Sequence, residues 1–261
     1  MSRQFSSDFL IEVQKGNVSG HSIIHKFGAN TVVGTSYVPV AAGGDYVMLQ
    51  PAAATALRVK AGNTNDTAAG SGAREVTIEG LDETGAKVQV ALATAGTSAS
   101  SATSETFIRL YRMWVSASGT YATMSAESHA AGIVIENGAG GTDWGTITTG
   151  GSTQARGQSE IGWYGVPTGS TAYVLSAKVF TDTARTTNIL FFQRTSILDA
   201  AVPYDAFRLM FEISSQGGPV DLIPNSPFPG VVGPADIGFM AKVDASTAEV
   251  DVDFEILLIA N

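Results

Sequence analysis

The chain has 261 residues, of which 44% are hydrophobic and only 15% are charged. The hydrophobic fraction is large enough to bury a core, which excludes wholesale disorder, while Ser, Thr, Asn and 29 Gly fill most polar positions and favour strands joined by turns. The net charge of −9 with scattered Lys and Arg argues against a nucleic-acid partner, and the absence of Cys excludes disulfides, thiolate metal ligands and cysteine nucleophiles.

Residues 1–36 differ in character from the rest, because they mix polar and apolar residues without alternation and contain two of the three His. We interpret them as an N-terminal arm that packs against a neighbour or against the sheet. The first 17 residues lack an apolar core for a secretory signal, and no stretch has 18 uninterrupted apolar residues. We therefore expect neither export nor a membrane partner, and folding in the cytoplasm where the chain is made.

Residues 37–261 are predicted to form a β-sandwich, either as one unit or as two β subdomains split near residue 150. A hairpin is predicted over Arg74–Leu92, where apolar and polar residues alternate on both sides of a turn that contains Gly85. Further strands are predicted at Phe107–Val115, Gly132–Glu136, Tyr173–Phe180, Asn188–Arg194, Phe207–Ser214 and Ile237–Val243. Residues 189–192 (ILFF) are apolar on both faces, which requires central burial or a covering subunit.

The loops between these strands are long and rich in small residues. Residues 62–72, 94–104 and 138–157 contain almost nothing expected to anchor a core. One short helix is predicted over Thr195–Ala201, ended by Pro203. The five prolines between Pro219 and Pro234 predict an extended connection and not the interior of a strand.

The C-terminus has the clearest pattern in the chain. Alternate residues from Val250 to Leu258 are apolar, and the residues between them include three carboxylates. A strand places these carboxylates on one face, whereas a helix would distribute them around its circumference. A half-buried strand is therefore predicted here.

The histidines are the first candidates for chemistry. His21 and His25 have the four-residue spacing of a helical zinc site, but Ser22 stands where the metalloprotease motif has Glu, and the β-branched Ile23 and Ile24 disfavour a helix. On a strand the two rings would lie about 13 Å apart, too far to share an ion. His129 has only its neighbours as triad partners, and the chain has no G-x-S-x-G elbow. We favour packing or surface positions for all three.

Three weaker candidates remain, and for each of them the structural interpretation is favoured. Residues 138–141 (GAGG) resemble a phosphate-binding turn but lack its third Gly position and its Lys-Ser/Thr pair, which favours a plain turn. Asn63, Asn65 and Asp66 offer too few carboxylates for calcium. A pair of glycosidase carboxylates cannot be assigned by spacing, and a sugar-stacking platform or a core position is open to Trp114, Trp144, Trp163 and Tyr164.

Three stretches resemble a group of tailed-bacteriophage virion proteins, described as head decoration (cement), fibre or tail components. The stretches are DFLIEVQKGNVSGHSIIHKFG (residues 8–28), NDTAAGSGAR leading into EVTIEGLD (residues 65–82) and GVPTGSTAYV (residues 165–174). They lie in the first two thirds of the chain. Capsid cement proteins of this kind are commonly jelly-roll-like sandwiches that sit as trimers on the shell.

The resemblance implies a non-enzymatic capsid decoration protein on the virion surface, with the major capsid protein and its own copies as partners and with no cofactor or metal. A tail or head-fibre component and a carbohydrate-binding module that uses Trp144 and Trp163 are the alternative functions. Contact with the shell is expected from the apolar residues of the arm, which are Phe9, Leu10, Ile11, Ile23, Ile24 and Phe27.

Overall fold

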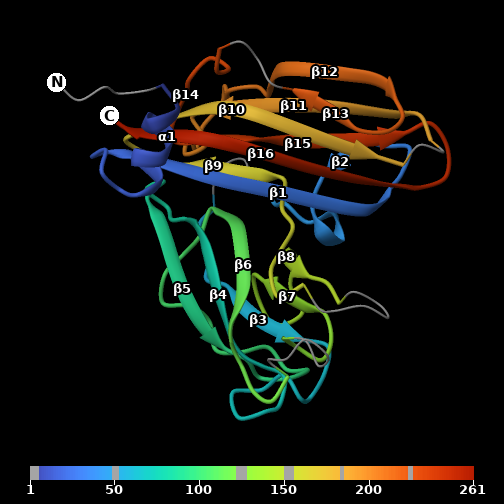
Figure 1. Ribbon diagram of the computed structural model, residues 1–261. Coiled ribbons are helices and arrows are strands. Elements are labelled where there is room, and N and C mark those ends of the chain that lie inside the picture. Colours follow the sequence, from blue (N-terminus) through green and yellow to red (C-terminus); the bar gives the residue numbers. More distant parts are fainter. Residues whose placement is uncertain (1–5, 49–52, 122–127, 150–155, 183–184, 223–225) are drawn as a thin grey trace.

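A computed structural model describes residues 6–48, 53–121, 128–149, 156–182, 185–222 and 226–261. The described chain is built from antiparallel strands, as the sequence predicts, arranged as a large sandwich above a smaller pair of sheets (Figure 1). We call the smaller pair the insert, because it is formed by residues between 53 and 149, in the middle of the sequence. No helix among the described residues has the length and hydropathy needed to cross a membrane.

The sandwich consists of sheet A and sheet B. Sheet A contains β1 (His21–Val33), β16 (Ala248–Ala260), β10 (Ser170–Thr181) and β13 (Val220–Leu222) in that order, with β14 (Val231–Val232) also paired to β10. Sheet B contains β12 (Arg208–Gln216), β11 (Thr187–Thr195), β15 (Ala235–Val243) and β2 (Val38–Pro39) in that order, with β9 (Trp163–Val166) also paired to β15. Outside the sheets lie α1 (Ser6–Gln14) and the short 3₁₀ turn η1 (Ala42–Gly44).

The insert consists of sheets C and D. Sheet C contains β3 (Arg58–Ala61), β7 (Ile133–Glu136) and β8 (Asp143–Ile147), and sheet D contains β5 (Lys87–Ala93), β4 (Ala73–Leu81) and β6 (Arg109–Ser118). The predicted hairpin is confirmed as β4 and β5, joined by a turn in which Gly85 has a φ of 75°. The other six strand predictions are confirmed by β6, β7, β10, β11, β12 and β15.

The C-terminal alternation is also confirmed, because β16 occupies the centre of sheet A. Val250, Val252, Phe254 and Ile256 are buried, while the intervening residues face outward or are half-buried. β16 pairs with β1 on one side and with β10 on the other. Residues 21–33 of the expected arm therefore form a strand of the sandwich.

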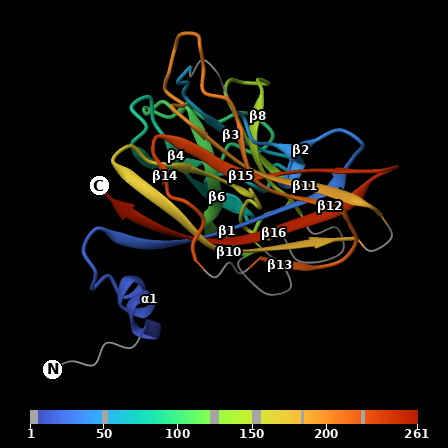
Figure 2. The same ribbon diagram turned by 90° about the horizontal axis from the view of Figure 1, so that it is seen from above.

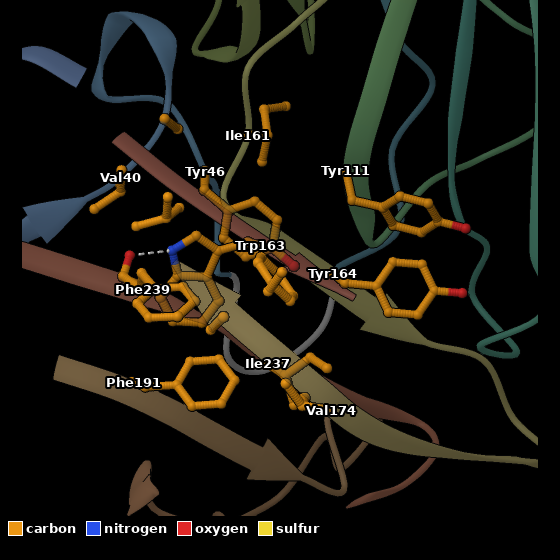
Figure 3. Close-up of a cluster of buried hydrophobic side chains, with 14 of the residues drawn as sticks. Val40, Tyr46, Tyr111, Ile161, Trp163, Tyr164, Val174, Phe191, Ile237 and Phe239 are labelled. Atoms are coloured by element: carbon orange, nitrogen blue, oxygen red, sulfur yellow. Dashed lines mark hydrogen bonds between the residues drawn. The ribbon is translucent and has the colours of Figure 1, made fainter. Parts of the chain in front are cut away.

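The sandwich core is aromatic. Phe191 and Phe239 stack with their ring centroids 4.4 Å apart, and the indole N–H of Trp163 donates to the carbonyl of Phe239 at 2.7 Å (Figure 3). Leu81, Ile108 and Tyr111 of the insert belong to the same buried cluster. A second buried cluster, which includes Trp144, fills the space between sheets C and D. The insert thus has its own core and also extends the core of the sandwich.

The helix prediction for Thr195–Ala201 is wrong. β11 continues to Thr195, and Ser196 then adopts a φ of 55°, which directs the chain into a turn. Ile197 is fully buried in the sandwich core. The tertiary burial of this one side chain outweighs the weak local preference for a helix.

The small-residue loops contain buried polar side chains that bind the backbone and that the sequence did not predict. The carboxylate of Asp66, which has no exposed surface, accepts backbone hydrogen bonds from Ala73 and Ala130 at 2.8 Å and from Ala131 at 3.2 Å. The hydroxyls of Ser100 and Thr103 accept from the backbone N–H groups of Val59 and Leu57. Buried backbone groups require partners, and these side chains provide them where strands do not.

The proline-rich connection runs outside the strand interiors, as predicted, over its described part. Pro219 directly precedes β13, and Pro234 lies between β14 and β15. Pro224 falls outside the described residues. The remaining connection leads along the edge of sheet A, where the absence of a proline N–H does not interrupt a ladder.

Candidate interaction surface

Helix α1 projects from the body of the molecule at the beginning of β1 (Figure 2). Phe9, Leu10 and Ile11 are 37%, 39% and 51% exposed, although Val13 is buried. A short helix that leaves three consecutive large apolar side chains in water has an unusual surface for a soluble protein, because apolar residues of this size are normally buried. These three residues form the most concentrated group among the exposed large apolar residues of the described chain.

The connection from α1 to β1 is tightly folded. The backbone N–H groups of Lys15, Gly16 and Asn17 donate to carbonyls within the helix, and Gly16 has a φ of 76°, a conformation that favours glycine. Hydrogen bonds from the side chains of Asn17 and Lys15 lower the pKa of the Glu12 carboxyl. The rings of Phe9 and His21 pack edge to face, with their centroids 5.9 Å apart. The helix is therefore fixed at its base.

The other expected contact residues lie on β1, on two different faces. Ile24 pairs in register with the buried Ile256 and packs against the sandwich core. Ile23 and Phe27 pair with Leu257 and Asp253 on the outer face of sheet A, and both are half-buried. The structure thus brings Ile23 and Phe27 to the same side of the sheet and directs Ile24 away from it.

The outer face of sheet A becomes acidic toward the beginning of β16. Glu249, Asp251, Asp253 and Glu255 alternate with the buried residues of this strand. A groove of about 380 Å³ runs over this region, and Phe27 and Phe180 contribute to its lining together with Glu249, Asp251 and Asp253. Burial, followed by repulsion from Glu249 and Glu160, raises the pKa of Asp251 to about 6.

A buried ion pair joins the insert to the sandwich. Arg109 on β6 contacts Asp236 on β15 through two hydrogen bonds of 2.8 and 2.9 Å, and neither side chain has exposed surface. The hydroxyl of Tyr46 donates to the same carboxylate at 3.0 Å, and Arg194 lies 3.8 Å from it. Burial opposes the charge of Arg109, but the neighbouring Asp236 raises the pKa of the guanidinium. These groups are engaged with each other and hold two elements in register.

A second polar contact crosses the same junction. The ammonium of Lys26 on β1 donates to the carbonyl of Tyr111 on β6, and Arg112 donates to the carbonyl of His25 at 2.7 Å. Lys26 is only 3% exposed, and burial together with the nearby Arg112 lowers the pKa of its amine well below the ordinary value. The sequence placed Lys26 in an arm and gave no signal for this role, because a single lysine has no periodicity.

No three side chains of His, Cys, Asp or Glu come together as a metal-binding group in the described part of the chain. His21 and His25 lie on β1, as the strand interpretation predicts, and the ring of His25 contacts Asp253 at 2.7 Å. The ring of His129 contacts the hydroxyl of its neighbour Ser128 at 2.8 Å. The oxygens of Asp66 that calcium would need accept backbone hydrogen bonds instead.

The Gly138–Gly141 stretch is the predicted turn. It connects β7 to β8, and Gly140 has a φ of 72°. Asn137 closes the turn by accepting a hydrogen bond from the N–H of Thr142. The stretch therefore belongs to a hairpin and does not begin a helix.

The favoured core interpretation is confirmed for Trp144, Trp163 and Tyr164, and the alternative of a sugar-stacking platform built from these rings is wrong. Trp144 and Trp163 are 1% and 0% exposed, and Tyr164 is 1% exposed, so their rings are unavailable to a ligand. Trp144 fills the core of the insert and Trp163 fills that of the sandwich. Only Trp114 of the four candidates is partly exposed. A carbohydrate-binding module that uses Trp144 and Trp163 is thereby excluded.

Comparisons with known proteins assign no family. No family model matches the chain, and no curated protein matches it. Among solved structures, the chain is similar to the VP2 protein of infectious bursal disease virus in a subviral particle, with 9% identity, a TM-score of 0.20 and coverage of 86% of this chain and 75% of that one. A D431N mutant VP2 from T=1 particles of the same virus gives 9% identity and a TM-score of 0.17, with coverage of 99% and 80%. TM-scores this low establish neither a shared fold nor a shared role.

Proposed function

We propose that this chain is a non-enzymatic virion structural protein that binds the outside of a capsid shell as a decoration protein. The observation that carries the proposal is the projecting helix α1 with its exposed Phe9, Leu10 and Ile11. The resemblance of residues 8–28 to bacteriophage virion proteins supports it, because that stretch includes residues 8–14 of this helix and residues 21–28 of β1.

The proposed mechanism is burial of the α1 side chains in an apolar recess of the major capsid protein. Full burial of one large apolar side chain contributes about 1.5–3 kcal/mol, so three half-exposed side chains contribute about 1 kcal/mol each. A partner that binds only the assembled shell shifts the equilibrium toward that state by mass action. The expected result is a shell that resists heat and internal pressure better than the bare one.

The proposed homotrimer is supported by the second face of sheet B. Ile189 and Phe191 of β11 are buried in the core, whereas Leu190 and Phe192 lie half-buried on the opposite face. Phe192 pairs in register with Leu209, which is 48% exposed, and Leu190 pairs with Met240. Phe192 and Met240 also pack against the sandwich core and Glu212 lies beside Leu190, so the area left for another copy to cover is centred on Leu209 and Leu190.

The absence of catalysis is part of the proposal. It is supported by what the buried ionisable groups do, since Arg109 and Asp236 satisfy each other and Asp66 satisfies three backbone N–H groups. These groups face the interior and join chain segments.

Binding to shells tests the proposal. Purified protein is added to shells that lack it, and bound protein is measured by co-sedimentation. Replacing Phe9, Leu10 and Ile11 together with Ser should reduce binding at least tenfold, since about 3 kcal/mol of apolar burial is lost. A matched control replaces Val32, Val202 and Val232, which are 63%, 77% and 55% exposed elsewhere, with Ser and should bind normally.

Two results would contradict the proposal. Equal binding by the α1 variant and the control would exclude α1 as the contact. Immunogold labelling of intact virions separates the head from the tail, because a decoration protein labels the whole head surface. Labelling confined to the tail would favour the fibre or tail component instead.

A further inference from the structure

The segment 156–162, which we call the return segment, joins the insert back to the sandwich. On the insert side, the carbonyl of Gly157 accepts from the N–H of Val115 at 2.8 Å, and the N–H of Ser159 donates to Met113 at 2.8 Å. On the sandwich side, the carbonyl of Glu160 accepts from Ala42 at 2.8 Å and from Ala29 at 3.3 Å. The return segment is therefore hydrogen-bonded to both the insert and the sandwich.

The outward side of the return segment lies in a groove where carboxylates outnumber cationic side chains. Arg156 forms an ion pair with Glu160, four residues later. Both side chains line the groove whose other wall contains Glu249 and Asp251 of β16. Asp251 lies opposite Ala29 in the ladder of β1 and β16, and Ala29 is hydrogen-bonded to Glu160. The carboxylates of Glu160, Glu249 and Asp251 therefore have the guanidinium of Arg156 as their common counter-charge.

The other carboxylates around the groove either contact a basic side chain or lie in the adjoining hollow. Asp253, the next outward residue of β16, contacts His25 of β1 at 2.7 Å and pairs in register with Lys178 of β10. Asp182, directly after β10, lines the adjoining hollow with Glu249 and Asp251. No further cation lines the groove among the described residues.

The protonation of Asp251 changes this balance near neutral pH. Burial, followed by repulsion from Glu249 and Glu160, raises the pKa of Asp251 from 3.8 to about 6 against the opposing effect of Arg156. The hydrogen bond with Glu160 raises the pKa of Arg156, which therefore stays charged. A carboxyl with a raised folded-state pKa binds its proton more readily in the folded state, so stability increases as the pH falls through about 6 toward 4 and is lost above that window.

We propose that Arg156, Glu160, Glu249 and Asp251 form an acid-sensitive clasp that holds the return segment on β1 and β16 more firmly at pH 5 than at pH 7.5. Protonated Asp251 no longer repels Glu160 and Glu249, so Arg156 then faces two carboxylates instead of three. Because the return segment is also hydrogen-bonded to β6, the clasp sets how firmly the insert is held on the sandwich. Acidity thereby strengthens one of the contacts that hold the insert on the sandwich.

Hydrogen exchange at two backbone amides measures the clasp directly. The N–H groups of Ala29 and Ala42 both donate to Glu160, and their protection factors correct for the intrinsic effect of pH on exchange. In the wild type, protection should increase severalfold, up to about tenfold, from pH 7.5 to pH 5, because the closed clasp binds the proton of Asp251 more tightly than the open one. The amides of Ser100 and Thr103, bonded to Val59 and Leu57 within the insert, serve as internal references and should change little.

Three variants identify the groups responsible. Asp251→Asn should remove the increase in protection, because it leaves an uncharged side chain at both pH values. Arg156→Met should enlarge the increase, because the three carboxylates then repel each other without a counter-charge at pH 7.5. Glu255→Gln, an exposed substitution on the same face of β16, should behave as the wild type and controls for the loss of one negative charge. All three leave the pair of His25 and Asp253 intact.

The proposal is overturned by either of two results. One is an unchanged increase in protection in Asp251→Asn, which would place the titrating group elsewhere. The other is an equal increase at the reference amides of the insert, which would show a global effect of pH. If Asp251→Asn folds poorly, the enlarged increase in Arg156→Met decides the question alone, and a smaller increase there contradicts the clasp.

Discussion

At the residue scale, the important side chains are polar groups buried away from the strand pattern. Asp66, Arg109 and Asp236 have no exposed surface. Nothing in the sequence distinguishes them from exposed charges, because their partners lie at remote positions and the alternation of a strand does not report what covers it. The burial of Asp66 and Asp236 could not be predicted from the sequence for this reason.

Removal of one partner from the buried ion pair should be costly. In Asp236→Asn the guanidinium of Arg109 stays buried without its counter-charge, so we expect a loss of about 3–5 kcal/mol in the free energy of unfolding. The measurement is urea denaturation at pH 7.

A double variant separates the ion pair from simple packing. Arg109→Met combined with Asp236→Leu removes both charges and should cost less than the sum of the losses in Arg109→Met alone and Asp236→Leu alone. Asp221→Asn on the exposed part of β13 should change stability by less than about 0.5 kcal/mol. Additive losses in the double variant would contradict the assigned coupling.

At the element scale, periodicity predicts strands well but predicts their neighbours poorly. β16 shows strict alternation because one of its faces is core and the other is outward. β1 shows no clean alternation because it contacts three surroundings in turn, namely the base of α1, the insert through Lys26 and the return segment through Gly28. The lack of alternation that suggested an arm is therefore explained by a strand that packs against several different neighbours.

The close approach of β1 to the return segment can be tested at one glycine. A Cβ atom at Gly28 would lie 2.1 Å from the backbone nitrogen of Gly162, so Gly28→Ala requires the two segments to separate. We expect a loss of about 2–3 kcal/mol in the free energy of unfolding, in the range of overpacked sites. Gly34, immediately after β1, has nothing within 4 Å of the corresponding position, and Gly34→Ala should be nearly neutral. Equal effects of the two substitutions in thermal denaturation would argue against this contact.

At the scale of the whole molecule, the chain forms two β bodies that do not divide at residue 150. β1 and β2 precede the insert in sequence but belong to the sandwich. Local composition does not reveal that the chain leaves the sandwich for the insert and then returns, because the strands of both have the same residue types. The fold class could be predicted from the sequence, whereas the insertion depends on long-range pairing between residues such as Val38 and Ala241.

The shared core predicts cooperative unfolding. Leu81, Ile108 and Tyr111 of the insert are buried in the sandwich cluster, and the ion pair of Arg109 and Asp236 crosses the same boundary. Differential scanning calorimetry should show one transition with equal calorimetric and van't Hoff enthalpies. Two separated transitions would show that the insert folds independently.

We propose that the exposed apolar side chains of α1 bind a capsid and stabilise it. The heat resistance of the virion tests this most directly. Virions that lack the protein should release their genome at a lower temperature than complete ones, and added purified protein should restore the difference. The restored particles should carry the chain in multiples of three, and the free protein should have a mass near three times 27.0 kDa by light scattering. Unchanged heat resistance, with a loss of host adsorption alone, would contradict the account.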